Sequence, residues 1–538
     1  MRIVGLLGIF ALLGIAYLMS NNRRIIPWRT LVWGLLLQLL FAAILLGRET
    51  LSYAAMLVLL AMIVIYLFND EIAGRIGRMA LAVALMAATI AAGWLLDRFQ
   101  MLGPLFWVLI AAIVVKAALR YYPAQKILAA GMLTTGFTHL FTHAITGRAV
   151  FAFISHKVEK FLALTDVGAE FLFGNLAVKR YFFTNGAGWP GFGFQFGFTV
   201  LPVIIFFACF MSILYHLGVM QVIIQAIARF MQWTMGTSGA ETLSCAANIF
   251  IGQTEAPLLV RPFLNDMTLS ELLTIMVGGF ATIAGGVLAG YIAMGINAGH
   301  LIAASVMSAP AALVVAKLIF PETQLSKTAG NVEIPHDIVQ STNLLDAASR
   351  GVTDGLKLAV NVGAMLIAFI ALIGLIDSIL SILDRLIDGR LLGGSYSAYE
   401  FVSNMTPVKG EYGGIFPGSL KTLFGTLLRP LAWLMGVSWQ FAGEVGNLLG
   451  IKLTLTEFVA YGTLAELINN RALDEKSIVI ATYALCGFAN FASIGIQIGG
   501  IGALVPQRRS ELSRIGLKAM FGGAIASWIT AAIAGILL

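Results

Sequence analysis

The chain has 538 residues, of which 59% are hydrophobic and only 11% are charged. This composition excludes a water-soluble fold, because a chain of this length cannot bury so much apolar surface, and it predicts a protein that is dissolved in lipid. The formal net charge of +7 does not indicate a nucleic-acid partner, because the Lys and Arg residues stand in short segments between apolar runs. Such segments are typical of cytoplasmic loops in membrane proteins. The three cysteines lie within apolar stretches, so no disulfide framework is expected.

The N-terminal apolar runs predict the first two membrane spans, at residues 3–19 and 31–46, since about 20 apolar residues cross a bilayer core. The flanks of the first run lack the pattern of a cleavable signal peptide, so we expect a retained span. Basic residues between 23 and 29 place that loop inside the cell and the N-terminus outside.

The segment from 47 to 147 contains further apolar runs. They predict four spans, at 52–68, 79–96, 104–119 and 127–145, with the strongest basic loops on one side. His139 and His143 stand four residues apart in the last run, a spacing that could place two imidazoles on one metal ion. No Glu accompanies them in a His-Glu-x-x-His pattern, so we interpret them as ordinary polar contacts near the end of a span.

The middle and last parts of the chain contain an interfacial segment and more spans. Residues 151–175 space apolar positions three and four apart with charges between them, which predicts a helix in the membrane interface. The polar stretch 318–357 predicts a solvent loop with a surface helix. Clear spans are expected at 199–215, 358–382, 478–503 and 517–537. The basic loop that begins at Pro506 is expected in the cytoplasm, which leaves the C-terminus outside.

These assignments divide the chain into seven consecutive parts. They are 1–46, the first two core spans; 47–147, an inserted segment of about four extra spans; 148–198, the interfacial helix region; 199–317, a scaffold span, a first re-entrant hairpin and repeat 1; 318–357, the polar cytoplasmic loop; 358–440, a scaffold span and an external segment; and 441–538, a second re-entrant hairpin and repeat 2.

A sparse internal repeat supports this division. Thr254-Glu255 is followed by the sequence Gly-Phe-Ala-Thr at 279–282, and Thr456-Glu457 is followed by Gly-Phe-Ala-Asn at 487–490. Each Thr-Glu pair lies in an apolar stretch too interrupted by Gly, Pro and polar residues to be one continuous span. Corresponding broken segments in two halves of a chain indicate a transporter site near the membrane midplane. Charge sidedness predicts that the two copies enter from opposite sides, so the repeats would be inverted.

Polar side chains concentrate in these broken segments, where they are costly unless they face a cavity. The first hairpin contains Asn248, Gln253, Thr254 and Glu255, and the second contains Glu457. Asn490 and Ser493 are three residues apart and are expected to share a helix face. A bland interpretation is that such groups only hold hairpins to spans. We favour a site in which helix ends, amides and a carboxylate hold a hydroxyl-rich solute and a cation.

The same residues resemble the concentrative nucleoside transporter family. Residues 252–263 (Gly-Gln-Thr-Glu-Ala-Pro-Leu-Leu-Val-Arg-Pro-Phe) look like the signature of its first hairpin, 450–461 look like its second, and 486–493 are similar to its penultimate span. The resemblance implies an all-α polytopic fold with eight core transmembrane helices and two inverted re-entrant hairpins, here with about four extra helices. It also implies a homotrimer in which a transport domain moves against a fixed scaffold.

The resemblance further implies roles for individual residues. The nucleobase would be contacted by Gln253, Thr254 and Glu255, and the apolar lining would include Val287 and Phe488. The ribose hydroxyls would be held by Glu457, Asn490 and Ser493. A sodium ion would be bound by the side chains of Asn248 and Thr282 and the carbonyl groups of Ile251 and Ile283. The sequence departs from the family at Thr456, where Asn is usual, and in the insert from about 49 to 147.

The resemblance implies a sodium-coupled symporter that takes up nucleosides of the uridine, cytidine and adenosine class across the plasma membrane, the inner membrane of a bacterium, by alternating access. Coupling to protons is the alternative. A membrane enzyme that uses Glu255 and Glu457 as acid and base would need a nucleophile or metal beside its base, and none is evident. A nucleoside-sensing receptor would need a signalling domain, for which the loops are too short. We therefore expect a carrier and no enzyme.

Overall fold

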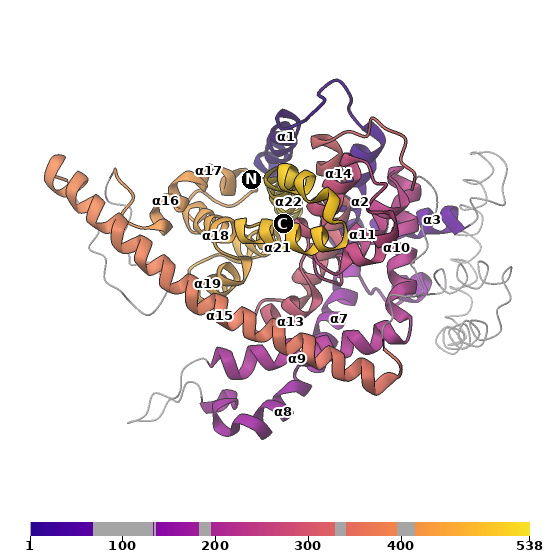
Figure 1. Cartoon of the computed structure of the whole chain (residues 1–538), viewed down its shortest axis with the longest axis horizontal. Helices are drawn as coiled ribbons and strands as arrows, with labels where there is room; N and C mark the ends of the chain where they lie inside the picture. Colours follow the sequence, from indigo (N-terminus) through magenta and orange to yellow (C-terminus); the bar gives the residue numbers. More distant parts are fainter. Residues whose placement is uncertain (1, 68–132, 134–135, 182–194, 329–340, 395–414) are drawn as a thin grey trace. The chain divides into compact units, whose positions relative to one another are not determined.

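The computed structural model describes residues 2–67, 133, 136–181, 195–328, 341–394 and 415–538, and within them every regular element is a helix (Figure 1). The main helices are α1 (Arg2–Leu18), α2 (Trp28–Leu46), α3 (Glu49–Leu67), α7 (Gly147–Leu162), α8 (Leu164–Phe173), α9 (Phe196–His216), α10 (Val219–Met235), α11 (Gly239–Ala247), α12 (Leu269–Ala281), α13 (Gly285–Ala293), α14 (Ala298–Ile319), α15 (Leu344–Asp384), α16 (Leu420–Leu427), α17 (Arg429–Leu434), α18 (Ala442–Thr454), α19 (Glu457–Asn469), α20 (Glu475–Leu485), α21 (Phe491–Leu504) and α22 (Arg509–Leu537). Tighter helical turns are η1 (Gly174–Leu176), η2 (Lys179–Tyr181), η3 (Ala256–Phe263) and η6 (Pro506–Arg508), and the wider η5 (Arg385–Leu391) follows α15.

Membrane-spanning character is confirmed by the helices themselves. Within the described residues, 7 helical segments are long and apolar enough to cross a bilayer. They are Trp28–Leu46, Glu49–Leu67, Phe196–His216, Leu269–Ala293, Ala298–Ile319, Leu344–Leu391 and Pro506–Leu537. The spans predicted at 79–96 and 104–119, and part of that at 127–145, lie outside the described residues. The total number of spans and the re-entrant course of the hairpins therefore stay predictions.

The chain forms two compact units, of which the smaller contains residues 39–154. In its described part, the Ser52 hydroxyl donates to the carbonyl oxygen of Ile44 at 2.8 Å and accepts from the amide of Gly147 at 3.1 Å. The His139 and His143 rings lie 4.2 Å apart, and Nδ1 of His143 lies 3.0 Å from the carbonyl oxygen of His139. No group of three metal-binding side chains occurs among the residues described. Within the described ranges, the pair therefore has no third ligand.

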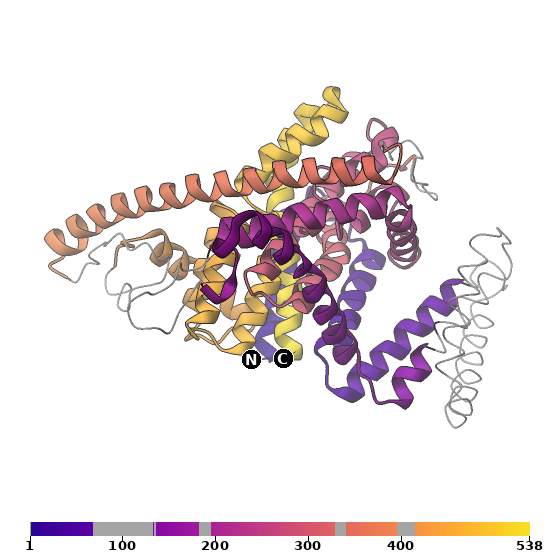
Figure 2. The same cartoon turned by 90° about the horizontal axis from the view of Figure 1, so that it is seen from below.

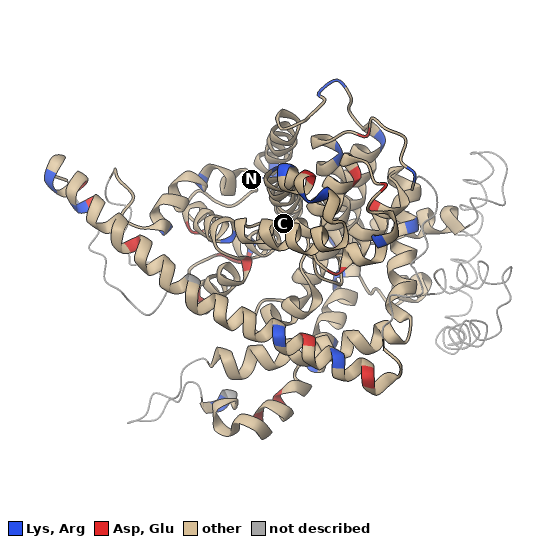
Figure 3. Ribbon diagram, viewed as in Figure 1, with Lys and Arg blue, Asp and Glu red and all other residues tan. Residues whose placement is uncertain are grey.

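The larger unit contains residues 1–38 and nearly all of 155–538, and a long helix, α15, lies in it beside α9 (Figure 2). This helix begins at Leu344, whereas the sequence predicted a span from 358 and, before it, a solvent loop with a separate surface helix; the structure has one continuous helix. Polar residues start the helix: the Asn343 side chain accepts from the Asp346 amide at 2.9 Å, and Asp346 pairs with Arg350 one turn later. Charged residues gather toward the two ends of α15 (Figure 3), and none occurs between Lys357 and Asp377.

Two spans in the larger unit are broken near their middle. The first is α12 and α13, separated by residues 282–284; the second is α20 and α21, separated by 486–490. The second break corrects the expectation of one continuous span over 478–503. Gly487 causes it, because its backbone has a φ of 110°, which favours glycine. A Cβ at Gly487 would lie 2.4 Å from the carbonyl oxygen of Phe280, so the two broken spans touch there.

Each broken span follows a short helical pair. In the first pair, α11 begins with a capping box formed by Ser238 and Glu241, and η3 contains Pro257 and Pro262, whose missing amide hydrogens prevent a regular α-helix. In the second pair, α18 packs against α19, and the Thr456 hydroxyl caps α19. Thr and Asn both serve as helix caps, so the departure from the family at Thr456 preserves the start of this helix.

Candidate functional site

The two broken spans and the two helical pairs meet at one cavity of about 200 Å³, here called the binding pocket. Its volume is small for a ligand site and suits a small solute. Its polar wall comes from the pairs and the second break, with Gln253, Thr254, Glu255, Thr456, Glu457, Asn490 and Ser493. The part of the lining that comes from α15 is entirely apolar, with Leu358, Val362, Met365 and Leu366. Specific recognition therefore comes from the polar wall.

The eight residues that the sequence assigned to a nucleoside site all line this pocket. They are Gln253, Thr254, Glu255, Val287, Glu457, Phe488, Asn490 and Ser493. They come from parts of the chain up to 240 residues apart, as the contact between Gln253 and Ser493 shows. The structure thus brings the set together, while the role of each residue stays a prediction.

A buried carboxylate defines the second hairpin's side of the pocket. Glu457 stands at the first residue of α19, where a negative charge is favoured by the helix N-terminus. Its Oε2 accepts from Nδ2 of Asn490 at 3.0 Å, and its Oε1 accepts from the hydroxyl of Tyr291 at 3.2 Å. Asn490 and Ser493 do not share a helix face as expected. Asn490 instead precedes α21, and its Oδ1 accepts from the amide of Ser493 at 2.8 Å.

A chain of amides fixes the orientation of Gln253. Nε2 of Gln497 donates to the carbonyl oxygen of Met276 at 3.1 Å and to Oε1 of Gln253 at 2.9 Å. Because a backbone carbonyl only accepts, Gln497 must present its nitrogen there. Gln253 must then turn its oxygen toward Gln497, which leaves its nitrogen to donate to the Ser493 hydroxyl at 3.3 Å. One donor hydrogen of Gln253 remains for the pocket.

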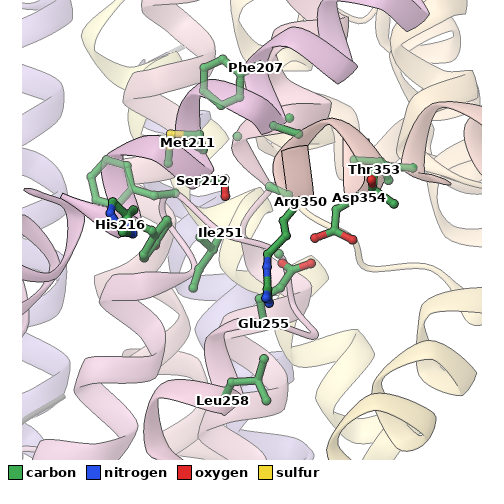
Figure 4. A pocket seen from close by; sticks show the side chains of 18 of the residues that line it. Phe207, Met211, Ser212, His216, Ile251, Glu255, Leu258, Arg350, Thr353 and Asp354 are labelled. Atoms are coloured by element: carbon green, nitrogen blue, oxygen red, sulfur yellow. The ribbon is translucent and has the colours of Figure 1, made fainter. Parts of the chain in front are cut away.

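Glu255 lines both the binding pocket and a larger cavity of about 730 Å³, here called the vestibule. Gly252, Ala284 and Leu358 also line both cavities, so the vestibule adjoins the pocket. The vestibule is bordered by Phe207, Met211 and Ser212 of α9, by Arg350, Thr353 and Asp354 of α15, and by hairpin residues around Glu255 (Figure 4). The Glu255 carboxylate folds over Gly252, where an added Cβ would lie 2.3 Å from Oε2. Only glycine leaves room for this arrangement.

The predicted cation ligands surround the first break. Asn248 ends α11 and is 1% exposed, yet neither its Oδ1 nor its Nδ2 has a hydrogen-bond partner in the described part of the chain. Its Nδ2 would lie 3.5 Å from a Cβ added to Gly278 of α12, so the amide packs against that helix. The carbonyl oxygen of Gly278 accepts from the Thr282 hydroxyl at 2.8 Å. Among the described residues, no hydrogen bond reaches the carbonyl oxygens of Ile251 or Ile283. These free oxygen atoms fit a sodium ion, which prefers oxygen ligands at broken helix ends.

Three polar residues of this region received no role from the sequence. Gln497 orients Gln253, and Tyr291 donates to Glu457. Lys452 is fully buried and donates to two carbonyl oxygens at the second break. Gln497 lies one helical turn after Ser493, a periodicity that could have identified it. A lysine inside an apolar hairpin was also a signal, because a charge in lipid needs a partner.

Helix breaks that meet around a buried pocket with one polar wall are typical of membrane proteins that carry small solutes. Comparison with sequence families agrees. Residues 7–67 match the N-terminus of the Na⁺ dependent nucleoside transporters, 300–535 match their C-terminus, and 197–298 match the nucleoside-recognition Gate family. The first match includes α3, which the sequence assigned to the insert.

Curated proteins give the same result. The chain is 43% identical over 404 residues to the sodium/nucleoside cotransporter 1 of Mus musculus, an alignment that covers 73% of this chain and 56% of that protein. It therefore spans little more than half the length of these cotransporters. It is 41% identical over 418 residues to an uncharacterized transporter of Haemophilus influenzae, covering 77% of this chain and 91% of that protein.

Solved structures are similar along the whole chain. The inward-facing, substrate-bound structure of CNTnw has a TM-score of 0.72 and 32% identity, and the alignment covers 100% of this chain and 98% of that one. Variants of CNTnw solved in outward-facing and intermediate states have TM-scores of 0.71. This protein belongs to the concentrative nucleoside transporter family.

Proposed function

We propose that this protein is a secondary active symporter that uses an inward flow of sodium to take up nucleosides, of the uridine, cytidine and adenosine class. The observation that supports this most strongly is the binding pocket, where polar side chains from the two helical pairs and the second break converge in a membrane protein of this family. Such groups are expensive in lipid, so a pocket that collects them is expected to bind a polar solute.

The two ends of the polar wall suit the two parts of a nucleoside. Glu457 and Asn490 offer a charged acceptor and an amide donor 3.0 Å apart, and a ribose hydroxyl can both donate and accept between them, with Ser493 nearby. Gln253 and its neighbours Thr254 and Glu255 offer amide, hydroxyl and carboxylate groups to the edge of a nucleobase. The apolar face of the base would rest against Val287 and Phe488.

The apolar wall on α15 supports alternating access by movement of the polar wall. Directional bonds to the solute come from the hairpins and the second break, whereas α15 offers only van der Waals contact to it. A polar wall that carries its solute along α15 would break no hydrogen bond between solute and helix. The several states in which CNTnw was solved are consistent with such movement in a relative.

Sodium is proposed as the coupling ion because the unpaired Asn248 amide and the free carbonyl oxygens of Ile251 and Ile283 lie with Thr282 at the first break. The names of the matched family and of the relatives also support sodium over protons. We further propose that the protein is a homotrimer in the bacterial inner, or plasma, membrane with both termini outside. Native mass spectrometry and labelling of terminal cysteines would test these two assignments.

The decisive experiment measures uptake of radiolabelled uridine and adenosine by the purified protein in liposomes. An inward sodium gradient should drive accumulation, and Glu457→Gln should abolish it by removing the charged acceptor. Glu475→Gln is the matched control, because Glu475 is exposed at the start of α20 and lies outside the pocket. It should leave uptake unchanged.

The outcomes separate the parts of the proposal. Equal uptake under a proton gradient without sodium would overturn sodium coupling and leave the carrier intact. No uptake of any nucleoside under either gradient would overturn both. Analogues that lack the 2′- or 3′-hydroxyl should compete about 5- to 150-fold less well, because a buried group left unpaired costs about 1–3 kcal/mol. Equal competition by both analogues would remove the ribose assignment.

A further inference from the structure

A fully buried lysine occupies the second hairpin. Lys452 lies in the last turn of α18 and is 0% exposed, and its Nζ donates to the carbonyl oxygens of Ala484 at 3.0 Å and Cys486 at 3.1 Å. A cationic side chain at membrane depth is retained only where it meets compensating groups. The ammonium is therefore fixed in place by the end of another helix.

That helix end is the second break. Ala484 and Cys486 lie at the C-terminus of α20, where unpaired carbonyl groups carry the negative end of the helix dipole. The Ser527 hydroxyl of α22 also donates to the carbonyl oxygen of Cys486. Several oxygen atoms thus converge at one point, which is a geometry that binds a small cation, and here the cation is an ammonium group.

The first repeat has a comparable arrangement, in which a polar side chain near the end of the hairpin's first helix lies beside the end of the broken span. Asn248 lies at the end of α11, the first helix of its hairpin, and borders the C-terminal end of α12, the first half of its broken span. Lys452 lies at the end of α18 and faces the C-terminal end of α20. Asn248 has no partner for either amide atom within the described residues, whereas Lys452 reaches its carbonyl partners directly.

We propose that the Lys452 ammonium is a tethered cation that fills, in repeat 2, the position that corresponds to the sodium position of repeat 1. The inference rests on the proposed function, since it takes the Asn248 site as the sodium site. It assigns a positioning role to Lys452, which holds the second break without lining the binding pocket. It predicts that the chain moves one sodium ion with each nucleoside.

The test replaces the lysine with an amide side chain of the kind that Asn248 has in the first repeat. In Lys452→Asn, the carbonyl oxygens of Ala484 and Cys486 and the new amide should accept a second sodium ion. The melting temperature of the purified full chain should then rise more steeply with NaCl, measured against choline chloride at equal ionic strength. The Hill coefficient for sodium-driven uridine uptake should rise from about 1 to about 2. Lys452→Met is the control, because it fills the space without an oxygen atom and should gain no sodium response.

Reversal potentials in proteoliposomes give a second measurement that needs no variant. The unmodified protein should move one charge with each uridine, and two charges would contradict a second position already filled by lysine. A folded Lys452→Asn protein with an unchanged sodium response would overturn the inference. The Lys452→Asn protein could fail to fold in choline chloride. Folding in NaCl alone would then support the inference, and failure to fold in both salts would count against it. Absence of any sodium response in the unmodified protein would instead overturn the proposed function.

Discussion

The amide chain behind the pocket predicts that Gln497 controls nucleoside affinity without contacting the solute. Gln497→Met keeps a similar volume but removes the donors to Oε1 of Gln253 at 2.9 Å and to the Met276 carbonyl oxygen at 3.1 Å. Binding must then restrain a Gln253 side chain that is no longer held, at a cost of about 1 kcal/mol, and one hydrogen bond worth about 1 kcal/mol is weakened. The sum, about 1–2 kcal/mol, corresponds to about a 5- to 30-fold rise in half-saturation concentration.

The assay is the concentration dependence of sodium-driven uridine and adenosine uptake in liposomes. Gln507→Met is the matched control, because Gln507 is exposed in η6 and remote from the pocket lining. Gln497→Glu adds a sharper test, since a carboxylate forces Gln253 to turn its nitrogen toward position 497 and its oxygen toward Ser493. That reversal should change the ratio of the uridine and adenosine half-saturation concentrations, whereas Gln497→Met should raise both. Unchanged half-saturation in folded Gln497→Met would refute the orienting role.

Three further substitutions test the packing that supports the site. Gly252→Ala would place a Cβ 2.3 Å from Oε2 of Glu255, so the carboxylate must move. Nucleoside uptake should fall while the melting temperature stays unchanged. Normal uptake would contradict the placement of Glu255. Lys317→Met removes the ammonium that lies 2.7 Å from the buried Glu241 carboxylate. The fold should lose about 3–5 kcal/mol of stability, measured as a lower melting temperature. A second substitution, Glu241→Gln, should partly restore the melting temperature. Gly487→Ala conflicts with a φ of 110° and with the backbone of the first broken span, so little folded protein is expected; a native melting temperature would contradict this packing.

The fold class could be predicted from the sequence because hydropathy is a local property that each apolar run displays by itself. The boundaries of the helices were harder to predict from the sequence. The run from 478 to 503 is apolar throughout, so hydropathy cannot locate a break that depends on the backbone conformation of Gly487 and on its contact with another span. Hydropathy likewise located the lipid-crossing part of α15 from 358, and the polar stretch before it predicted a separate surface helix. It could not show that the two are one helix, which begins at Leu344 after the Asn343 cap.

The polar half of the binding pocket could be predicted because Gln253, Glu457 and Asn490 are conspicuous in apolar surroundings. The apolar half could not, since Leu358 and its neighbours on α15 have the composition of any lipid-facing helix. Tyr291 also escaped notice, because its partner Glu457 lies 166 residues away in the sequence. Its bond to Glu457 depends on the contact between α13 and α19, which local sequence does not specify.

The polar groups around the pocket are hydrogen-bonded to one another. Glu457 accepts from Asn490 of its own repeat and from Tyr291 of the other repeat, while Gln253 of the first hairpin donates to Ser493 of the second broken span. A solute that binds must replace some of these bonds with equally good ones, because each group is buried and an unpaired group costs about 1–3 kcal/mol. The bonds from Tyr291 to Glu457 and from Gln253 to Ser493 join the two repeats. A well-matched nucleoside would replace them with its own hydrogen bonds to both repeats, whereas a poorly matched solute would leave the repeats without these bonds. Selectivity and the integrity of the moving polar wall therefore depend on the same few bonds.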